Sequence, residues 1–130
     1  MKMTREEGIE IIRQGVADSL ALDLVEVRSD SRLITDLSAD SLDFLDIIFM
    51  LEEKFSVKLR EGELDFLAKL ELNSSKMMNG EYLKREAVDS LVPRLPALND
   101  EPDLDCIKPG RLYALITIET LWLMVADHLN

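Results

Sequence analysis

Hydrophobic residues in the first part of the chain recur with the three-and-four spacing of an amphipathic helix. The stretch opens with Thr4 and Glu7 in the capping-box pattern, in which each side chain satisfies a backbone amide at the helix start. The apolar positions that follow lie on one helical face: Ile9, Ile12, Val16 and Leu20. The pattern predicts a first helix with one buried face, although Gly8 and Gly15 lower its intrinsic propensity.

A second helix is predicted from Ser41, with Asp40 as its N-cap. At about 100° per residue, one side of this helix collects large apolar side chains: Phe44, Ile47, Ile48, Leu51 and Phe55. The opposite side mixes acidic and apolar side chains: Leu42, Asp43, Asp46, Phe49, Met50 and Glu53. A face that only meets water has no need of Leu, Phe and Met, so this second face is a candidate contact surface.

The rest of the chain shows shorter and less regular patterns. Residues 21–39 are predicted to form a long loop partly packed on the core, and residues 56–59 a short strand-like link. Further helices are predicted over 61–70 and 81–92, with a loop at 73–80 between them and an irregular acidic stretch at 98–110. Thr117 is the predicted N-cap of a last helix that buries Ile118, Leu121, Trp122 and Val125. The expected fold class is all-α, with residues 1–130 in one domain.

The charge balance restricts the classes of partner. The 130 residues include 26 acidic and 15 basic side chains, for a net charge of −11. Such a surface repels phosphate backbones and anionic lipids, so it argues against nucleic-acid and membrane-surface binding and favours basic protein partners. The single cysteine, Cys106, leaves no pair for a disulfide or a structural zinc site. With no apolar signal core at the start and no apolar run long enough to span a bilayer, we expect a cytoplasmic protein.

The segment from Asp36 to Phe55 resembles the acyl carrier proteins of fatty acid and polyketide synthesis. The resemblance rests on the Asp40-Ser41-Leu42 triplet, the helix that it opens, the closing Leu51-Glu52-Glu53-Lys54-Phe55, and the acid excess. It covers about residues 4–59 and resumes at about 116–129. Between these parts, where the family has a short loop and one short helix, residues 60–115 form an insertion. The resemblance therefore implies an acyl-carrier-protein-like helical bundle with additional inserted helices.

The resemblance also implies a function for Ser41. A separate phosphopantetheinyl transferase would attach 4'-phosphopantetheine from coenzyme A to this serine, and the arm would carry an acyl group as a thioester. A helix N-terminus suits this role because its open amides and dipole favour a phosphate, and Asp40 completes the attachment motif. Taken alone, an Asp-Ser-Leu triplet is also compatible with an ordinary first-turn serine.

Two further residue sets follow from the resemblance. The second helix would provide the surface on which acyl-transferring, elongating and modifying enzymes dock through basic patches: Leu42, Asp43, Asp46, Phe49, Met50, Glu52 and Glu53. The stretch from Asp36 to Glu53 supports this with six acids and no Lys or Arg, although a solvated face is the simpler interpretation of the acids alone. The inner face would shelter the acyl chain, with ordinary core packing as the alternative: Phe44, Ile47, Ile48, Leu51, Trp122 and Val125. We expect a monomer.

The insertion differs in composition from the acidic carrier core. Residues 66–111 contain eight acidic and seven basic side chains, so this stretch is nearly neutral. We hypothesise that it enlarges the domain to accommodate an unusual acyl chain or to select a dedicated set of partners. A purely stabilising extension is the alternative.

Other functions remain open at this level. An enzyme would need a base near Ser41, but the single histidine is His128, no Gly-x-Ser-x-Gly motif is present, and Cys106 has no evident partner. A metal-binding module could use four neighbouring acids, Asp36, Asp40, Asp43 and Asp46, but they lack the EF-hand pattern, and no dedicated metal site is expected. An aminoacyl or peptidyl carrier and an unmodified carrier-shaped adaptor are the remaining alternatives.

Overall fold

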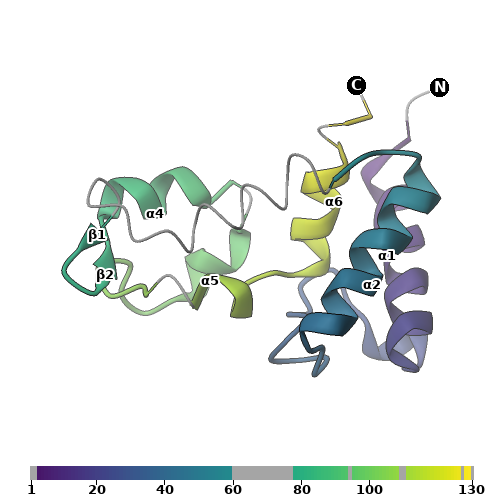
Figure 1. Ribbon diagram of the computed structural model, residues 1–130, viewed down its shortest axis with the longest axis horizontal. Helices are drawn as coiled ribbons and strands as arrows, with labels where there is room; N and C mark the ends of the chain where they lie inside the picture. Colours follow the sequence, from purple (N-terminus) through teal and green to yellow (C-terminus); the bar gives the residue numbers. More distant parts are fainter. Residues whose placement is uncertain (1–2, 60–77, 94, 109–110, 127, 130) are drawn as a thin grey trace.

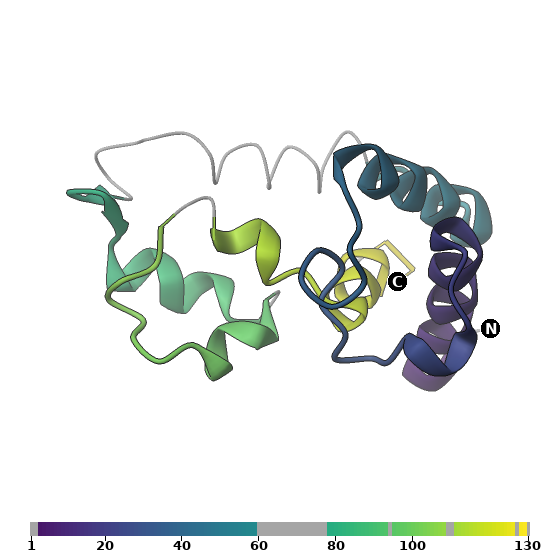
Figure 2. The same ribbon diagram turned by 90° about the horizontal axis from the view of Figure 1, so that it is seen from below.

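A computed structural model describes residues 3–59, 78–93, 95–108, 111–126 and 128–129. Helices α1 (Arg5–Leu20), α2 (Ser41–Phe55) and α6 (Ile118–Ala126) gather at one end of an elongated molecule. The described part of the insertion makes up the other end, and both views show this division (Figures 1 and 2). Among the described residues, no helix combines the length and the apolar character needed to cross a bilayer.

Helix α1 begins as its sequence predicts. The Glu7 amide donates to the Thr4 hydroxyl oxygen at 3.1 Å, and the Glu7 carboxylate accepts from the Thr4 amide, so the capping box is complete. Ile12 and Val16 are fully buried against α2 and α6. The helix ends at Leu20, and its C-cap residue, Ala21, adopts the left-handed conformation with φ 55°.

The loop between α1 and α2 is packed on the core, as predicted. It contains one short 3-10 helix, η1 (Leu24–Glu26), and Arg13 of α1 donates to the Leu24 carbonyl at 3.1 Å and to the Val27 carbonyl. Val27 and Leu33 are buried, so this long connection contributes apolar contacts as well as chain reversal.

The same loop is hydrogen-bonded to the segment that leads into α6. The Leu33 amide donates to the Ile116 carbonyl at 3.0 Å, and the Ile118 amide donates to the Ser31 carbonyl at 3.2 Å. Thr117 then caps α6 as predicted, because its hydroxyl accepts from the Thr120 amide at 3.2 Å. These bonds join the chain before α2 to the last helix across the whole insertion.

Helix α2 runs over the predicted residues but the link after it is not a strand. Ser56 terminates the helix in the left-handed conformation with φ 54°, and residues 57–59 have no strand partner among the described residues. Instead the Leu59 amide donates to the Glu52 carboxylate at 2.9 Å, and the Leu59 side chain is fully buried. The segment that was predicted to be strand-like is therefore held by a side-chain hydrogen bond to α2.

The insertion begins, in its described part, with a hairpin that the sequence interpretation missed. Strands β1 (Met78–Asn79) and β2 (Tyr82–Leu83) are antiparallel, and their two-residue loop starts with Gly80 at φ 70°. The predicted helix over 81–92 is therefore wrong at its start, because α4 covers only Arg85–Leu91. A glycine at the first position of a two-residue loop favours a hairpin, and β2 takes up residues that the helix was predicted to contain. The predicted helix over 61–70 lies outside the described residues.

Residues 101–108 contain no helix or strand, as predicted for the stretch 98–110, whose last two residues lie outside the described part. The start of that stretch is not irregular, because residues 98–100 belong to a 3-10 helix, η2 (Pro96–Asp100). A short helix, α5 (Arg111–Ala114), leads toward the last helix. The Leu83 amide donates to the Ile107 carbonyl at 2.8 Å, which ties the irregular stretch to the hairpin.

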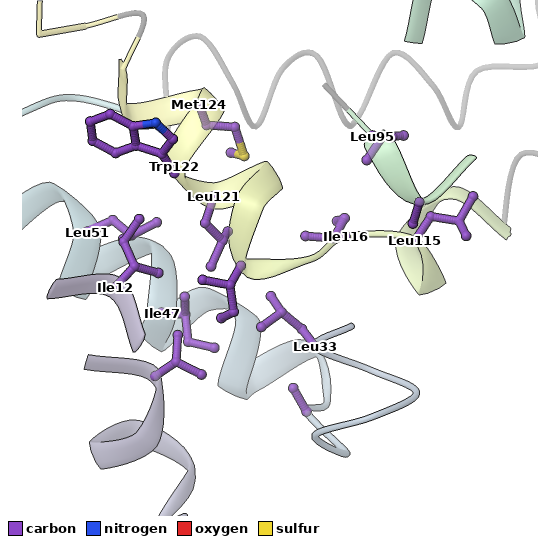
Figure 3. Packing of buried hydrophobic residues seen from close by; sticks show 14 of the residues in the cluster. Ile12, Leu33, Ile47, Leu51, Leu95, Leu115, Ile116, Leu121, Trp122 and Met124 are labelled. Carbon is purple, nitrogen blue, oxygen red and sulfur yellow. The ribbon is translucent and has the colours of Figure 1, made fainter. Parts of the chain in front are cut away.

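Buried apolar residues form one cluster that extends from the three helices into the insertion (Figure 3). Ile12, Ile47 and Leu121 represent the helical end, and Leu33 and Ile116 lie at the junction. Five leucines of the insertion are nearly or fully buried: Leu83, Leu95, Leu98, Leu112 and Leu115. Because burial of apolar area is the main favourable term in folding, the insertion has an apolar interior of its own that continues into that of the helices.

The ion pair between Arg111 and Glu101 in the insertion can be tested through the pH dependence of the free energy of unfolding. The Arg111 guanidinium donates to the Glu101 carboxylate at 2.6 Å and lowers the pKa of Glu101. We expect Glu101→Gln to lower the free energy of unfolding at pH 7 by up to about 1 kcal/mol. A depressed folded-state pKa stabilises above the ordinary glutamate value of 4.5, so the difference from wild type should shrink as the pH falls through the lower, folded-state pKa. Urea titrations of both proteins at several pH values measure this difference in the free energy of unfolding. A difference that does not change with pH would contradict the ion-pair assignment.

Candidate functional site

The N-terminal turn of α2 is built by reciprocal hydrogen bonds between two aspartates. The Asp43 amide donates to the Asp40 carboxylate at 2.8 Å, and the Asp40 amide donates to the Asp43 carboxylate at 3.0 Å. Asp40 therefore occupies the predicted N-cap position, and Ser41 is the first residue of the helix. The Asp-Ser-Leu-Asp sequence forms this capping box with aspartate in both positions.

The backbone at this helix end suits a phosphate ester. The Asp43 amide is bound by the Asp40 side chain, and the Phe44 amide donates to the Asp40 carbonyl at 2.9 Å. The two amides ahead of these, from Ser41 and Leu42, lie at the open end of a 15-residue helix, where the helix dipole favours an anion. The chemistry of this donor set thus fits the phosphate of a phosphopantetheine arm.

Three large apolar side chains form an exposed stripe along the outer side of α2. Leu42 is 71% exposed, Phe49 45% and Leu45 42%. We call Leu42, Leu45 and Phe49 the apolar stripe. Leu45 was missed in the sequence interpretation, although helical spacing places it between Leu42 and Phe49 on the same side. Single exposed apolar residues are common, but a row of three along one helix is a candidate contact surface.

Of the acidic residues predicted for docking, two are exposed and two accept hydrogen bonds from backbone amides of this chain. Asp46 and Glu53 are exposed on α2 beside the apolar stripe. Asp43 forms the capping box, and Glu52 holds the Leu59 amide, so both carboxylates also stabilise local structure. Met50 is half-buried and packs over Gly15 of α1, at the edge of the predicted surface. Their contribution to docking stays a prediction.

The predicted acyl-pocket residues come together in the core between the helices. Phe44 is half-buried, and four others are fully buried: Ile47, Ile48, Leu51 and Val125. Trp122 is 7% exposed, and its ring lies 6.5 Å from that of Phe55 at an interplanar angle of 56°. Figure 3 shows Ile47, Leu51 and Trp122 around the same interior. These positions agree with either ordinary core packing or a cargo site.

The cysteine and the histidine that an enzyme or a metal site could use are not on α2, where Ser41 lies. The Cys106 thiol is exposed in the insertion, and its contact with the Asp103 carboxylate raises its pKa, which is the opposite of an activated nucleophile. His128 is exposed after the last helix. Within the part of the chain that the structure describes, no three His, Cys, Asp or Glu side chains are grouped so that they could hold a metal ion.

Comparison with known proteins identifies the class of this site. A family model described as "Phosphopantetheine attachment site" matches residues 10–74, which is half of the chain. The acyl carrier protein of Helicobacter hepaticus is 41% identical over 59 residues, covering 45% of this chain and 78% of the relative. The acyl carrier protein of Campylobacter jejuni subsp. doylei is 40% identical over 60 residues, covering 46% and 78%. No solved structure matches significantly.

The chain therefore belongs to the acyl carrier protein family. Members of this family are carriers, not enzymes, and they bear 4'-phosphopantetheine as a prosthetic group. The predicted family, helical fold class and cofactor are thus confirmed. The insertion extends beyond residue 74, and its described part starts at residue 78, so all of that part lies outside the family match.

Proposed function

We propose that the chain holds an acyl group as a thioester on a 4'-phosphopantetheine arm attached to Ser41. It delivers this cargo to enzymes of fatty acid, polyketide or specialised lipid synthesis. The observation that carries the proposal is the position of Ser41 as first residue of α2, inside the family match, next to an Asp40–Asp43 capping box. The capping box defines where the helix starts and so keeps the first amides available to the phosphate.

The test is the intact mass of the purified chain before and after incubation with coenzyme A, Mg²⁺ and a broad-specificity phosphopantetheinyl transferase. The expected result is a gain of one phosphopantetheine per chain. A folded chain that gains no mass, beside a control carrier that is fully modified, would overturn the proposal.

The apolar stripe supports a role in docking. Basic enzyme patches would meet the exposed acids Asp46 and Glu53, and apolar pockets would take Leu42 and Leu45. Long-range attraction between unlike charges speeds encounter, while buried apolar contacts contribute most of the binding energy. The partners proposed on this basis are the phosphopantetheinyl transferase and the acyl-handling enzymes.

Replacing two leucines of the stripe tests this surface. We expect the double substitution Leu42→Ser, Leu45→Ser to lower kcat/KM of the transferase about tenfold or more, because each contact contributes about 1 kcal/mol or more to docking. The measurement is the initial rate of phosphopantetheine transfer at several carrier concentrations.

The matched control is Val25→Ser on η1, which removes an apolar side chain that is 83% exposed but lies off α2. Its transfer rate should equal that of the wild type. Equal losses in the double variant and in the control would show that general surface hydrophobicity, and not the stripe, determines the rate.

The insertion is proposed to be part of one carrier domain with the helices, over residues 1–130. The continuous apolar cluster supports this, and so do the hydrogen bonds that join residues 31–33 to 116–118 across it. These bonds join the loop that leads to α2 with the segment at the start of α6, so the insertion is connected to the loop that precedes the proposed attachment site.

A further inference from the structure

An open hollow lies beside the first turn of α2. Its volume is about 480 Å³, and it is bounded by the end of α1, by η1 and by the chain just before and after Ser41. The lining residues are Ser19, Leu20, Ala21, Leu22, Glu26, Asp36, Leu37, Ser38 and Asp43. On α2 it adjoins Asp43, about 100° around the helix from Leu42 of the apolar stripe.

The lining combines apolar side chains with hydrogen-bond acceptors. Leu20, Leu22 and Leu37 contribute apolar surface. Three carboxylates line the same hollow, and each accepts a backbone hydrogen bond that helps to orient it. The Asp36 carboxylate accepts from the Arg32 amide at 2.8 Å, that of Glu26 from the Asp23 amide at 3.1 Å, and that of Asp43 from the Asp40 amide at 3.0 Å. An ionised carboxylate has about four acceptor positions, so further acceptor capacity remains.

This chemistry limits the occupant. Three carboxylates repel an anion, and these acids are not grouped closely enough, among the described residues, to hold a metal ion. A neutral chain that has both hydrogen-bond donors and an apolar part fits best. The pantetheine portion of the prosthetic group has two amide N–H groups, a hydroxyl and a dimethyl-substituted carbon, and it bears no charge beyond its phosphate.

Attachment at Ser41 would also place such a chain at the hollow. Ser38 and Asp43, which line it, are three residues before and two residues after Ser41. A short flexible tether gives an effective concentration on the order of millimolar, so weak contacts are enough to populate a bound state.

We infer that the hollow is a resting site for the pantetheine part of the arm, with Leu22 and Leu37 contacting its dimethyl group and Asp36 and Glu26 accepting from its amides. The inference rests on the proposed attachment to Ser41. Because the hollow adjoins α2 at Asp43, about 100° around the helix from Leu42, a docked pantetheine chain would lie to one side of the apolar stripe.

The test compares backbone amide chemical shifts of the unloaded and the loaded chain, with loading verified by intact mass. Loading should shift the signals of residues 19–22 and 36–38 as well as those of the first turn of α2. In Ser19→Trp, which places a bulky ring at an exposed lining position, the loading-dependent shifts at 36–38 should be lost. Gln14→Trp, at an exposed position of α1 that does not line the hollow, should keep them.

The outcomes separate the two proposals. A loaded wild-type chain whose shifts are confined to residues 40–44 overturns the resting site and leaves the carrier function intact. The same holds if Ser19→Trp and Gln14→Trp show identical shifts on loading. A chain that gains no mass overturns the carrier proposal and the resting site together.

Discussion

The Ser41→Ala variant is expected to gain no phosphopantetheine under conditions in which the wild-type chain is completely modified. The transfer joins the phosphate to a side-chain oxygen, and alanine has none. The helix itself should persist, because Asp40 and Asp43 form its capping box without the serine side chain. A first-turn substitution outside the cap changes the free energy of unfolding by about 0.5 kcal/mol or less. Intact mass after transferase treatment, together with a urea midpoint, measures both quantities.

The control is Ser38→Gly, which removes the hydroxyl nearest to Ser41 along the sequence. Ser38 is exposed and has φ 60°, a conformation that glycine adopts without strain. This variant should be modified like the wild type. Modification of Ser41→Ala would contradict the attachment site, and loss of modification in both variants would point to a general effect on recognition of the loop.

Features that depend on a few neighbouring residues were predicted well. The capping boxes and N-caps at Thr4, Asp40 and Thr117 each place a polar side chain one residue before a helix, and the structure has all of them. Such caps are local because donor and acceptor lie within three residues of each other. The start of α2, and with it the position of Ser41, could therefore be read from the sequence.

Features that depend on distant partners could not be read in the same way. The pattern predicts a helix over residues 81–92, but the helix starts only at Arg85, because Tyr82 and Leu83 pair with the preceding strand. Met50 was assigned to the outer face, but its side chain packs over Gly15 of α1, and Glu52 binds the amide of Leu59. A helical wheel places residues around one axis and does not show which neighbouring helix or loop covers each side.

The two glycines of α1 illustrate the same limit. In the sequence they only weaken a helix, since glycine costs about 1 kcal/mol relative to alanine inside one. In the structure both are buried at close contacts, Gly8 against the Trp122 ring of α6 and Gly15 against the Met50 side chain of α2. The missing side chains allow α1 to approach both neighbours closely, and this advantage is visible only when the three helices are together.

Gly8→Ala is expected to destabilise the fold, although alanine is the better helix former. A Cβ atom at this position would overlap three atoms of the six-membered ring of Trp122. The ring is rigid and 7% exposed, and it packs near Phe55, so the helix or the whole indole must move. Overpacking of this kind costs roughly 1–3 kcal/mol, and the gain in helix propensity offsets about 1 kcal/mol of it, so we expect a net loss of up to about 2 kcal/mol. Urea unfolding followed by far-UV circular dichroism measures it.

Gly15→Ala is the matched control on the same helix. Its Cβ would lie 2.5 Å from the Met50 Sδ and Cε atoms, so here the obstacle is the far end of a flexible side chain. Methionine can change rotamer at small cost, and the helix-propensity gain offsets it, so the free energy of unfolding should stay within about 1 kcal/mol of wild type. If both variants lose equal stability, rigidity of the Trp122 contact is not what limits the approach of α1 to α6. If only Gly8→Ala does, the indole ring sets the spacing between α1 and α6.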